Sequence, residues 1–281
     1  MPSEPLSVKQ CLVSGMVESG LPRLEAQMLL AHTLGQSRVW LIAHDDHVLS
    51  DTQVGVFKNL CQRRVAGEPM AYLMGEREFM GLTFEVSPAV LIPRPETELL
   101  VQTALDLVAD LVQPCMLDLG TGSGAIAVAL AHARPDARIW ATDISQAALE
   151  LAQRNADRNA VTVEFALGSW FDALRLTDFK FDLIVSNPPY IAAGDDHLNQ
   201  GDLRFEPRAA LTDEADGLSA YRIIVAGARN LLTASGHLCV EHGFEQGPAV
   251  SGLFQQGGFL GVKTIQDLAG LPRVTAGSYN G

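Results

Sequence analysis

The spacing of apolar residues predicts a helical domain at the beginning of the chain. Within residues 1–78, apolar side chains recur three and four positions apart, as at Leu24, Met28 and Ala31. This spacing is the period of an amphipathic helix, whereas the alternation typical of a strand is nearly absent. Ser7 is a suitable cap for the first helix. We therefore expect a small all-α domain over residues 1–78.

The pattern changes over residues 79–95. Apolar residues are interrupted there by glycine and proline, including Gly81, Pro88 and Pro93, which are typical of a short hairpin and a connecting segment. We place the boundary between two domains in this linker. A second amphipathic pattern then begins at Glu96 and predicts a helix up to Leu111.

The remainder, residues 96–281, alternates apolar strand patterns with helical patterns. Such alternation predicts right-handed crossovers and a mostly parallel sheet with helices on both faces, a doubly wound α/β domain. Sheets of this kind bind ligands at the carboxyl ends of their strands. The expected strands are Met116–Leu119, Ile139–Thr142, Thr162–Ala166, Phe181–Ser186 and His237–Glu241.

Composition and charge narrow the class of protein. The 281 residues are 47% hydrophobic and 19% charged, which is enough apolar surface for a substantial core. The net charge of -13 disfavours direct binding of nucleic acid, because it repels phosphate at long range. Without an amino-terminal targeting pattern or a run of 18 apolar residues, we expect a cytoplasmic protein that does not enter a membrane.

Cysteine and histidine spacing argues against a metal site. The cysteines lie far apart, no C-x-x-C pair occurs, and no histidine pair has the spacing of a zinc-binding helix. We expect no metal and no disulfide framework. We interpret the four cysteines as buried free thiols: Cys11, Cys61, Cys115 and Cys239.

A glycine-rich loop follows the first strand of the α/β domain and precedes a helical segment. Alternate glycines allow a sharp turn from strand to helix and let a ligand approach the main chain closely. We expect a cofactor to bind here, at Asp118, Gly120, Thr121, Gly122, Ser123 and Gly124. The same spacing also satisfies a loose dinucleotide pattern, so a dehydrogenase stays possible at this point.

Two further residues are candidates for holding a nucleoside. Asp143 ends the second strand, where a carboxylate can accept protons from both ribose hydroxyls, and Ser145 is better placed than Asp143 to cap the next helix. Trp170 follows the third strand, and its indole could lie against an adenine ring or pack in the core. The residues themselves do not decide between these two roles of the tryptophan.

The tetrapeptide Asn187-Pro188-Pro189-Tyr190 selects the reaction. The two prolines fix the backbone and push Asn187 into an extended conformation. The Asn187 side-chain oxygen and the Pro188 backbone oxygen are then available as two acceptors that match the two protons of a planar NH₂ group. Tyr190 offers a flat wall for an amide. We expect Asn187, Pro188 and Tyr190 to be catalytic, and all four residues to bind the substrate.

With these motifs in place, the sequence resembles the class I methyltransferases that act on planar NH₂ groups. Two other stretches, Ile92–Glu98 and His197–Pro207, together with Arg273-Val274-Thr275, resemble the peptide chain release factor glutamine methyltransferase family over nearly the whole chain. The resemblance implies a Rossmann-like methyltransferase domain and a helical domain that recognises the substrate. This sequence departs from the family pattern at Ser169, because family members often carry an acidic residue immediately before the aromatic residue that Trp170 matches.

The resemblance also implies a reaction and partners. The cofactor would be S-adenosyl-L-methionine, giving S-adenosyl-L-homocysteine, and it would be held by the loop, Asp143, Trp170 and Asn187. The substrate would be the glutamine of the Gly-Gly-Gln motif of class 1 release factors, methylated on N5 by a monomeric enzyme. This modification would modulate translation termination.

Several other functions compete with this prediction. A ribosomal protein glutamine methyltransferase shares the catalytic tetrapeptide, but the stretch Gly201–Pro207 argues against it. A DNA adenine-N6 methyltransferase is disfavoured because no basic target-recognition domain is present. A dehydrogenase has no use for Asn187-Pro188-Pro189-Tyr190. A non-catalytic adaptor predicts that replacing Asn187 leaves function intact.

Overall fold

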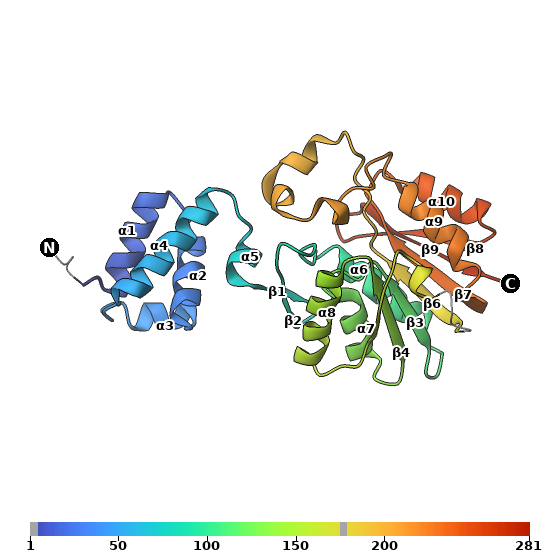
Figure 1. Cartoon of the computed structure of the whole chain (residues 1–281), viewed down its shortest axis with the longest axis horizontal. Helices are drawn as coiled ribbons and strands as arrows, with labels where there is room; N and C mark the ends of the chain where they lie inside the picture. Colours follow the sequence, from blue (N-terminus) through green and yellow to red (C-terminus); the bar gives the residue numbers. More distant parts are fainter. Residues whose placement is uncertain (1–4, 175–178) are drawn as a thin grey trace. The chain divides into compact units, whose positions relative to one another are not determined.

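The chain consists of two compact units that divide between Gly75 and Glu76 (Figure 1). The computed structural model describes residues 5–174 and 179–281. Gly75 adopts a left-handed conformation that ends the last helix of the first unit, and Glu76 begins a strand. The hairpin therefore begins earlier than the expected linker at residue 79, because this glycine already terminates the helical pattern.

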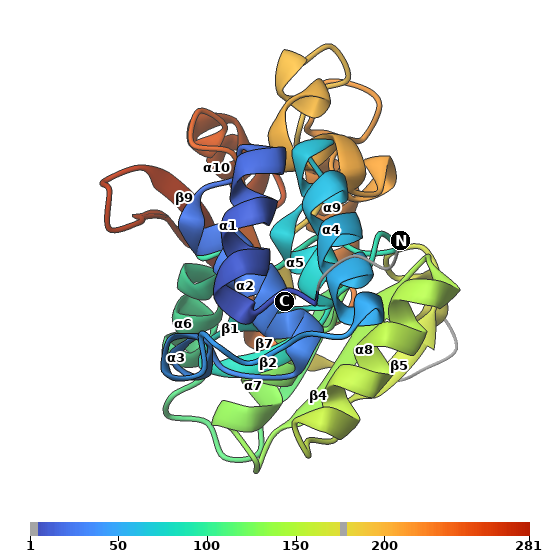
Figure 2. The ribbon, with the colours of Figure 1, turned by 90° about the vertical axis from the view of Figure 1, so that its left-hand side faces the viewer.

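The first unit is the expected helical domain. Ser7 caps its first helix through a capping box with Gln10, as the sequence predicts for Ser7. The helices pack around a core that includes Leu29, Leu30 and Phe57, and α1, α2 and α4 lie side by side (Figure 2). Within residues 5–75, the helices are α1 (Val8–Ser19), α2 (Arg23–Leu34), α3 (Arg38–Ala43), α4 (Asp51–Val65) and α5 (Met70–Met74).

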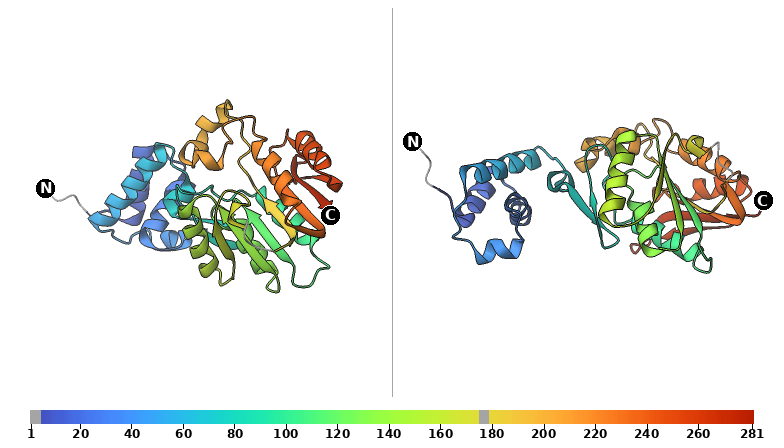
Figure 3. Two further views of the ribbon diagram at one scale, coloured as in Figure 1. Left: turned by 45° about the vertical axis from the view of Figure 1, so that its right-hand side comes forward. Right: turned by 60° about the horizontal axis from the view of Figure 1, so that its bottom comes forward.

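The second unit begins with a two-stranded antiparallel hairpin, β1 (Glu76–Phe79) and β2 (Leu82–Glu85). Strand β2 lies beside α8 (Gln146–Arg158) (Figure 3). The buried Asn155 of α8 accepts a hydrogen bond from the Glu85 N–H at 2.7 Å and donates to the Glu85 carbonyl at 3.0 Å and the Ser123 carbonyl at 2.8 Å. One side chain thus joins the hairpin to the glycine-rich loop.

A seven-stranded sheet forms the centre of the second unit, in the order β5-β4-β3-β6-β7-β9-β8. Its strands are β3 (Cys115–Leu119), β4 (Arg138–Asp143), β5 (Glu164–Leu167), β6 (Phe181–Ser186), β7 (Leu232–Glu241), β8 (Leu260–Gln266) and β9 (Pro272–Tyr279). The helices besides α8 are α6 (Thr97–Leu107), α7 (Ala125–Ala133), α9 (Ser219–Ala228) and α10 (Gly247–Gln256), with short 3₁₀ helices η1 (Asp172–Leu174), η2 (Asp196–Asn199), η3 (Gly201–Phe205) and η4 (Arg208–Ala210).

Alternate residues of the central strands face two separate cores. Leu183 and Val185 of β6 pack in the core that contains α6, α7 and part of α8, whereas Ile184 packs in the core that contains α9 and α10. Helices α6, α7 and α8 lie on one side of the sheet, and α9 and α10 lie on the other (Figure 1). Because successive strand side chains point to opposite faces, a strand covered on both sides reads as a continuous apolar run. The expected doubly wound sheet with a helical amino-terminal domain is confirmed.

The last two strands lie outside the sequence prediction. β9 runs antiparallel to both β7 and β8. β8 lies at the edge of the sheet, and most of its side chains are exposed or half-buried, which removes the apolar signal of a core strand. β9 contains Pro272 and Gly277, residues that are rare inside strands.

Two further expectations concerned the state of the cysteines and the absence of a membrane-spanning segment. The four cysteines are free thiols; Cys11, Cys61 and Cys239 are buried, and Cys115 is half-buried. Within residues 5–174 and 179–281, the helices are too short or too polar for any of them to cross a membrane.

Replacing Asn155 should destabilise the second unit strongly. In Asn155→Leu, the Glu85 N–H, the Glu85 carbonyl and the Ser123 carbonyl lose their partner, and each unpaired buried backbone group costs about 1–3 kcal/mol. We expect the free energy of unfolding in urea to fall by about 3 kcal/mol or more. The matched control is Gln153→Ala on the exposed face of the same helix, with a change within about 0.5 kcal/mol. Equal effects of the two variants would contradict this role of Asn155.

Candidate functional site

The strand register brings the predicted site residues to one edge of the sheet. In the parallel ladders, Leu119 pairs with Thr142 on one side and with Ser186 on the other. Ser186 in turn pairs with Val240. The glycine-rich loop, Asp143 and Asn187 therefore begin at adjacent carboxyl ends, the position at which doubly wound sheets bind ligands.

The glycine-rich loop is held at its base by the neighbouring strand. The Gly120 and Thr121 N–H groups donate to the Thr142 carbonyl at 2.9 and 3.0 Å. Gly120, Gly122 and Gly124 have φ values of 73, 55 and 81°, a region that side chains with a Cβ rarely adopt.

Gly124 also allows two helices to pack closely. A Cβ at this position would lie 3.0 Å from the Cβ of Ala152 and 3.2 Å from its Cα. The glycine therefore serves the packing of α7 against α8 as well as the turn.

Asp118 lies fully buried beneath the loop. Its Oδ2 accepts a hydrogen bond from the Thr121 hydroxyl at 2.7 Å, and its Oδ1 has no hydrogen-bond partner within the described residues. Burial raises the pKa of this carboxyl to about 7. The Ala127 backbone N–H and the Thr121 hydroxyl oppose this effect by favouring the charged form, so the carboxyl interacts with both the loop and the first turn of α7.

The Asp143 carboxylate ties the loop to the next helix. Its Oδ2 accepts from the Gly122 N–H at 2.9 Å and its Oδ1 from the Ser145 N–H at 2.8 Å. The Ser145 side chain caps α8 by accepting from the Ala148 N–H, as the sequence predicts. Each carboxylate oxygen keeps a second lone pair, so Asp143 retains acceptor capacity toward a diol.

Trp170 stands over the loop rather than deep inside the core. A Cβ built on Gly120 would lie 3.7 Å from Cζ3 of the half-buried indole. The tryptophan has a φ of 50°, which is unusual for a bulky residue, and its carbonyl accepts a hydrogen bond from the Thr142 hydroxyl at 3.2 Å. The turn thus places the indole between the glycine-rich loop and the core that contains α9 and α10, with part of the ring exposed beside Gly120.

The Asn187-Pro188-Pro189-Tyr190 segment continues from β6. The Ser186 hydroxyl donates to the Leu119 carbonyl at 2.7 Å and joins the end of β6 to the start of the loop. The Asn187 Nδ2 donates to the Thr97 hydroxyl at 3.1 Å. Among residues 5–174 and 179–281, no hydrogen bond is made to the Pro188 carbonyl, so this oxygen can accept from a ligand.

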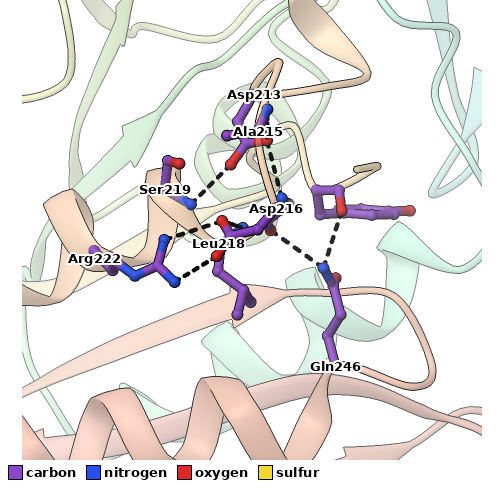
Figure 4. A network of polar contacts seen from close by, with 9 residues as sticks. Asp213, Ala215, Asp216, Leu218, Ser219, Arg222 and Gln246 are labelled. Atoms are coloured by element: carbon purple, nitrogen blue, oxygen red, sulfur yellow. Dashed lines mark hydrogen bonds and ion pairs between the residues drawn. The ribbon is translucent and has the colours of Figure 1, made fainter. Parts of the chain in front are cut away.

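A polar network fixes the backbone beyond this segment. The Gln246 Nε2 donates to the Tyr190 carbonyl at 2.9 Å and to the Gly217 carbonyl at 3.2 Å. Asp213 accepts from the Gly217 and Ser219 N–H groups and shapes the adjoining turn (Figure 4). At Gly217 a Cβ would lie 2.4 Å from the Tyr190 carbonyl oxygen, so the turn can approach this closely only with glycine.

An ion pair that the sequence did not predict joins the stretches Ile92–Glu98 and His197–Pro207. The Glu206 side chain is fully buried, pairs with the Arg94 guanidinium and accepts from the Ile92 N–H at 3.0 Å. Burial raises the pKa of Glu206, against the opposing effect of Arg94. The ion pair joins two stretches that are far apart in the sequence, a partnership that spacing along the chain does not reveal.

Sequence reasoning also missed Thr97 and Glu241. Both residues are buried. The Thr97 hydroxyl accepts a hydrogen bond from Asn187, and Glu241 lies close enough for Thr97 and Asn187 to lower the pKa of its carboxyl. Glu241 ends an expected apolar strand, and an acidic residue at the carboxyl end of such a strand was a usable signal. Thr97 lies in the stretch Ile92–Glu98 that carries the family resemblance, but its contact with Asn187 could not be predicted because a threonine at a helix start is common.

Family models match both units of the chain. The "Methyltransferase small domain" model matches residues 95–205, and the "PrmC N-terminal domain" model matches residues 15–75. Solved structures with the same fold include a methyltransferase from Pyrococcus furiosus, with a TM-score of 0.52 and 17% identity over 79% of this chain and 98% of that one. Another is a T. thermophilus 16S rRNA methyltransferase in complex with AdoMet and guanosine, with a TM-score of 0.54 and 20% identity over 73% of this chain and 50% of that one.

Curated relatives are similar over almost their entire length. The release factor glutamine methyltransferase of Bordetella pertussis is 52% identical over 262 residues, covering 93% of this chain and 97% of the relative. The protein with the same name from Burkholderia pseudomallei is 51% identical over 269 residues, covering 94% of each. The family predicted from the sequence motifs is confirmed: the chain belongs to the release factor glutamine methyltransferases.

Proposed function

We propose that this protein transfers a methyl group from S-adenosyl-L-methionine to the side-chain amide nitrogen of the glutamine in the Gly-Gly-Gln motif of class 1 release factors. The observation that carries this proposal is the position of Asn187 and Pro188 at the end of β6, next to the glycine-rich loop. Two acceptor oxygens at a proline-fixed corner suit a carboxamide NH₂ group. Membership in the release factor glutamine methyltransferases supports the choice of substrate.

The residues around the loop fit the cofactor. Gly120, Gly122 and Gly124 expose backbone without side chains, and Asp143 offers acceptor lone pairs for a ribose. The Trp170 indole beside Gly120 provides a face for an adenine ring. When bound, S-adenosyl-L-methionine supplies an activated methyl group, and S-adenosyl-L-homocysteine is the product. Thr121 and Ser123 belong to the same loop, and Asn155 holds the Ser123 carbonyl. We propose that Asp118 contributes to cofactor binding by fixing the loop through its hydrogen bond from Thr121.

The substrate side of the site holds and polarises an amide. The Asn187 Oδ1 and the Pro188 carbonyl would accept hydrogen bonds from the two N–H groups of the glutamine, which turns electron density on its nitrogen toward the incoming methyl group. One of the two N–H protons would be released to water after the methyl transfer. Pro189 stiffens the corner, and Tyr190 lies against the amide as a wall. Burial raises the pKa of Tyr190 well above its usual range, so this phenol stays neutral and acts by position rather than as a base.

The setting of the reaction follows from the substrate. A protein partner agrees with the net charge of -13, which disfavours direct contact with nucleic acid. We propose that the enzyme acts as a monomer in the cytoplasm, where release factors function, and that the helical unit recognises the release factor.

The direct test is methyl transfer to a purified class 1 release factor. With isotope-labelled S-adenosyl-L-methionine, we expect label on the glutamine of the Gly-Gly-Gln motif, located by mass mapping of peptides. A release factor with this glutamine replaced by alanine is the matched control and should stay unlabelled. Label on DNA, on a ribosomal protein, or on another residue of the release factor would contradict the proposed substrate.

Replacing Asn187 should remove catalysis and change cofactor affinity only slightly, because we propose that the glycine-rich loop, Asp143 and Trp170 provide most of the contacts to the cofactor. Loss of one preorganised polar group that acts in the transition state typically costs about 100-fold or more in rate. In Asn187→Ala we therefore expect kcat to fall by about 100-fold or more, while the Kd for S-adenosyl-L-methionine by calorimetry changes by less than about threefold. A parallel loss of both quantities would refute the assigned role.

Replacing Asp143 should produce the opposite pattern. Asp143→Ala removes the proposed ribose acceptor and the partners of the Gly122 and Ser145 N–H groups. We expect the Kd for S-adenosyl-L-methionine to rise by about 10-fold or more, because a hydrogen bond to a charged group contributes about 1.5–3 kcal/mol. The exposed Asp157→Ala on α8 is the control and should bind normally. Unchanged cofactor affinity in Asp143→Ala would exclude this contact.

A further inference from the structure

The topology places Glu241 beside Asn187. Ser186 of β6 pairs with Val240 of β7, so the next residues along the two parallel strands, Asn187 and Glu241, are neighbours as well. Both follow strand residues whose side chains alternate between the faces of the sheet. Since Val185 and Cys239 pack in the core that contains α6, the side chains two positions later, at Asn187 and Glu241, turn to the same face.

The first turn of α6 also contacts Asn187. Thr97, the first residue of the helix, is buried, and its hydroxyl accepts from the Asn187 Nδ2 at 3.1 Å. Glu241 is buried with 1% residual exposure, and its Oε2 has no hydrogen-bond partner within the described residues. The neighbouring Thr97 and Asn187 side chains lower the pKa of Glu241 and so favour its charged form. Three polar side chains thus lie close together: Thr97 at the start of α6, Asn187 directly after β6, and Glu241 at the end of β7.

The chemistry of the three groups permits one orientation of the asparagine amide. An ionised carboxylate only accepts hydrogen bonds, whereas an amide has a donor end and an acceptor end. The donor end of Asn187 must therefore face Glu241 and the Thr97 oxygen. Its Oδ1 then points the other way, to the side on which a substrate NH₂ group would need an acceptor. If the amide rotated by half a turn, an NH₂ group would face the substrate NH₂ group and the contact would be lost.

We propose that Glu241, together with Thr97, is a positioning residue that locks the Asn187 amide with its oxygen toward the substrate glutamine. This inference rests on the proposed function and adds a device to it. Glu241 touches neither reacting group and acts through Asn187. Its burial is otherwise costly, because a charged group removed from water needs compensation by partners.

Protonation of Glu241 would remove this restraint on the Asn187 amide. A protonated carboxyl can donate a hydrogen bond, so it could pair with the amide oxygen of Asn187 when the amide is rotated by half a turn. Burial raises the pKa of Glu241 to about 7, against the opposing effects of Thr97 and Arg273. The ionised form, which holds the lock, therefore gains population as pH rises through about 7. The titratable and charged groups that face it are Arg273 of β9, Glu96 before α6, Tyr190 after β6 and Tyr221 of α9, whose hydroxyl donates to the Glu241 carbonyl.

The test compares matched variants of the full chain in release factor methylation. Thr97→Val keeps the shape of threonine without the hydroxyl, and Thr97→Ser restores the hydroxyl. We expect kcat to fall by about 10-fold or more in Thr97→Val and in Glu241→Gln, with substantial recovery in Thr97→Ser, since small misplacements of a catalytic group cost up to about 100-fold. The Kd for S-adenosyl-L-methionine and the melting temperature should stay close to those of the unaltered protein in the Thr97 pair.

Two readouts separate positioning from mere support of the fold. The kcat of the unaltered protein should rise with pH through about 7, and this dependence should be absent in Glu241→Gln. Independently of activity, the NMR signals of the Asn187 side-chain NH₂ group, assigned by their loss in Asn187→Ala, should shift over the same pH range and not in Glu241→Gln. The second readout stays informative if the methylation substrate is wrong.

Three results would overturn the inference. One is a Thr97→Val enzyme as fast as Thr97→Ser and the unaltered protein. Another is a loss of kcat matched by equal losses of cofactor affinity and melting temperature. The third is an Asn187 NH₂ signal that is insensitive to pH. If the unaltered protein fails to methylate the release factor while the NMR signals change as expected, the proposed function is wrong. The inference that Glu241 and Thr97 fix the orientation of the Asn187 amide would then still hold.

Discussion

The in-register pairing of β3 with β4 and β6 is the constraint on which the site depends. Because Leu119 pairs with both Thr142 and Ser186, the next residue along each strand lies at the same edge of the sheet. A shift by one residue would turn every strand side chain to the opposite face and bury the wrong set. The two cores on the faces of the sheet therefore hold the glycine-rich loop, Asp143 and Asn187 in mutual position, without a direct bond between the loop and Asn187.

Much of this site could be predicted from local sequence, because its groups lie in short motifs at strand ends. The glycine-rich loop, Asp143 with Ser145 as the neighbouring cap, and the Asn187-Pro188 corner each express their conformation through residues adjacent in the chain. Glycine and proline restrict the backbone in ways that need no tertiary information. The sheet and the helical unit were predictable for a similar reason, since apolar periodicity is local.

Features that depend on distant partners could not be predicted in this way. Thr97 and Glu241 meet Asn187 through the arrangement of α6, β6 and β7, and Glu206 meets Arg94 across a long separation in the chain. Strands β8 and β9 were missed because one lies exposed at the edge and the other carries proline and glycine. In each case the residue types are ordinary, and their meaning comes from neighbours that the fold supplies.

The shared use of Asn155 has a consequence for how disturbances spread within the second unit. One amide side chain serves both the hairpin, at Glu85, and the glycine-rich loop, at Ser123. Opening of the hairpin would leave the Asn155 amide held only by its hydrogen bond to the Ser123 carbonyl, which weakens the restraint on the loop. A ligand that orders the loop would favour the closed hairpin by the same free energy. The first element after the helical unit is thereby energetically linked to the occupancy of the cofactor site.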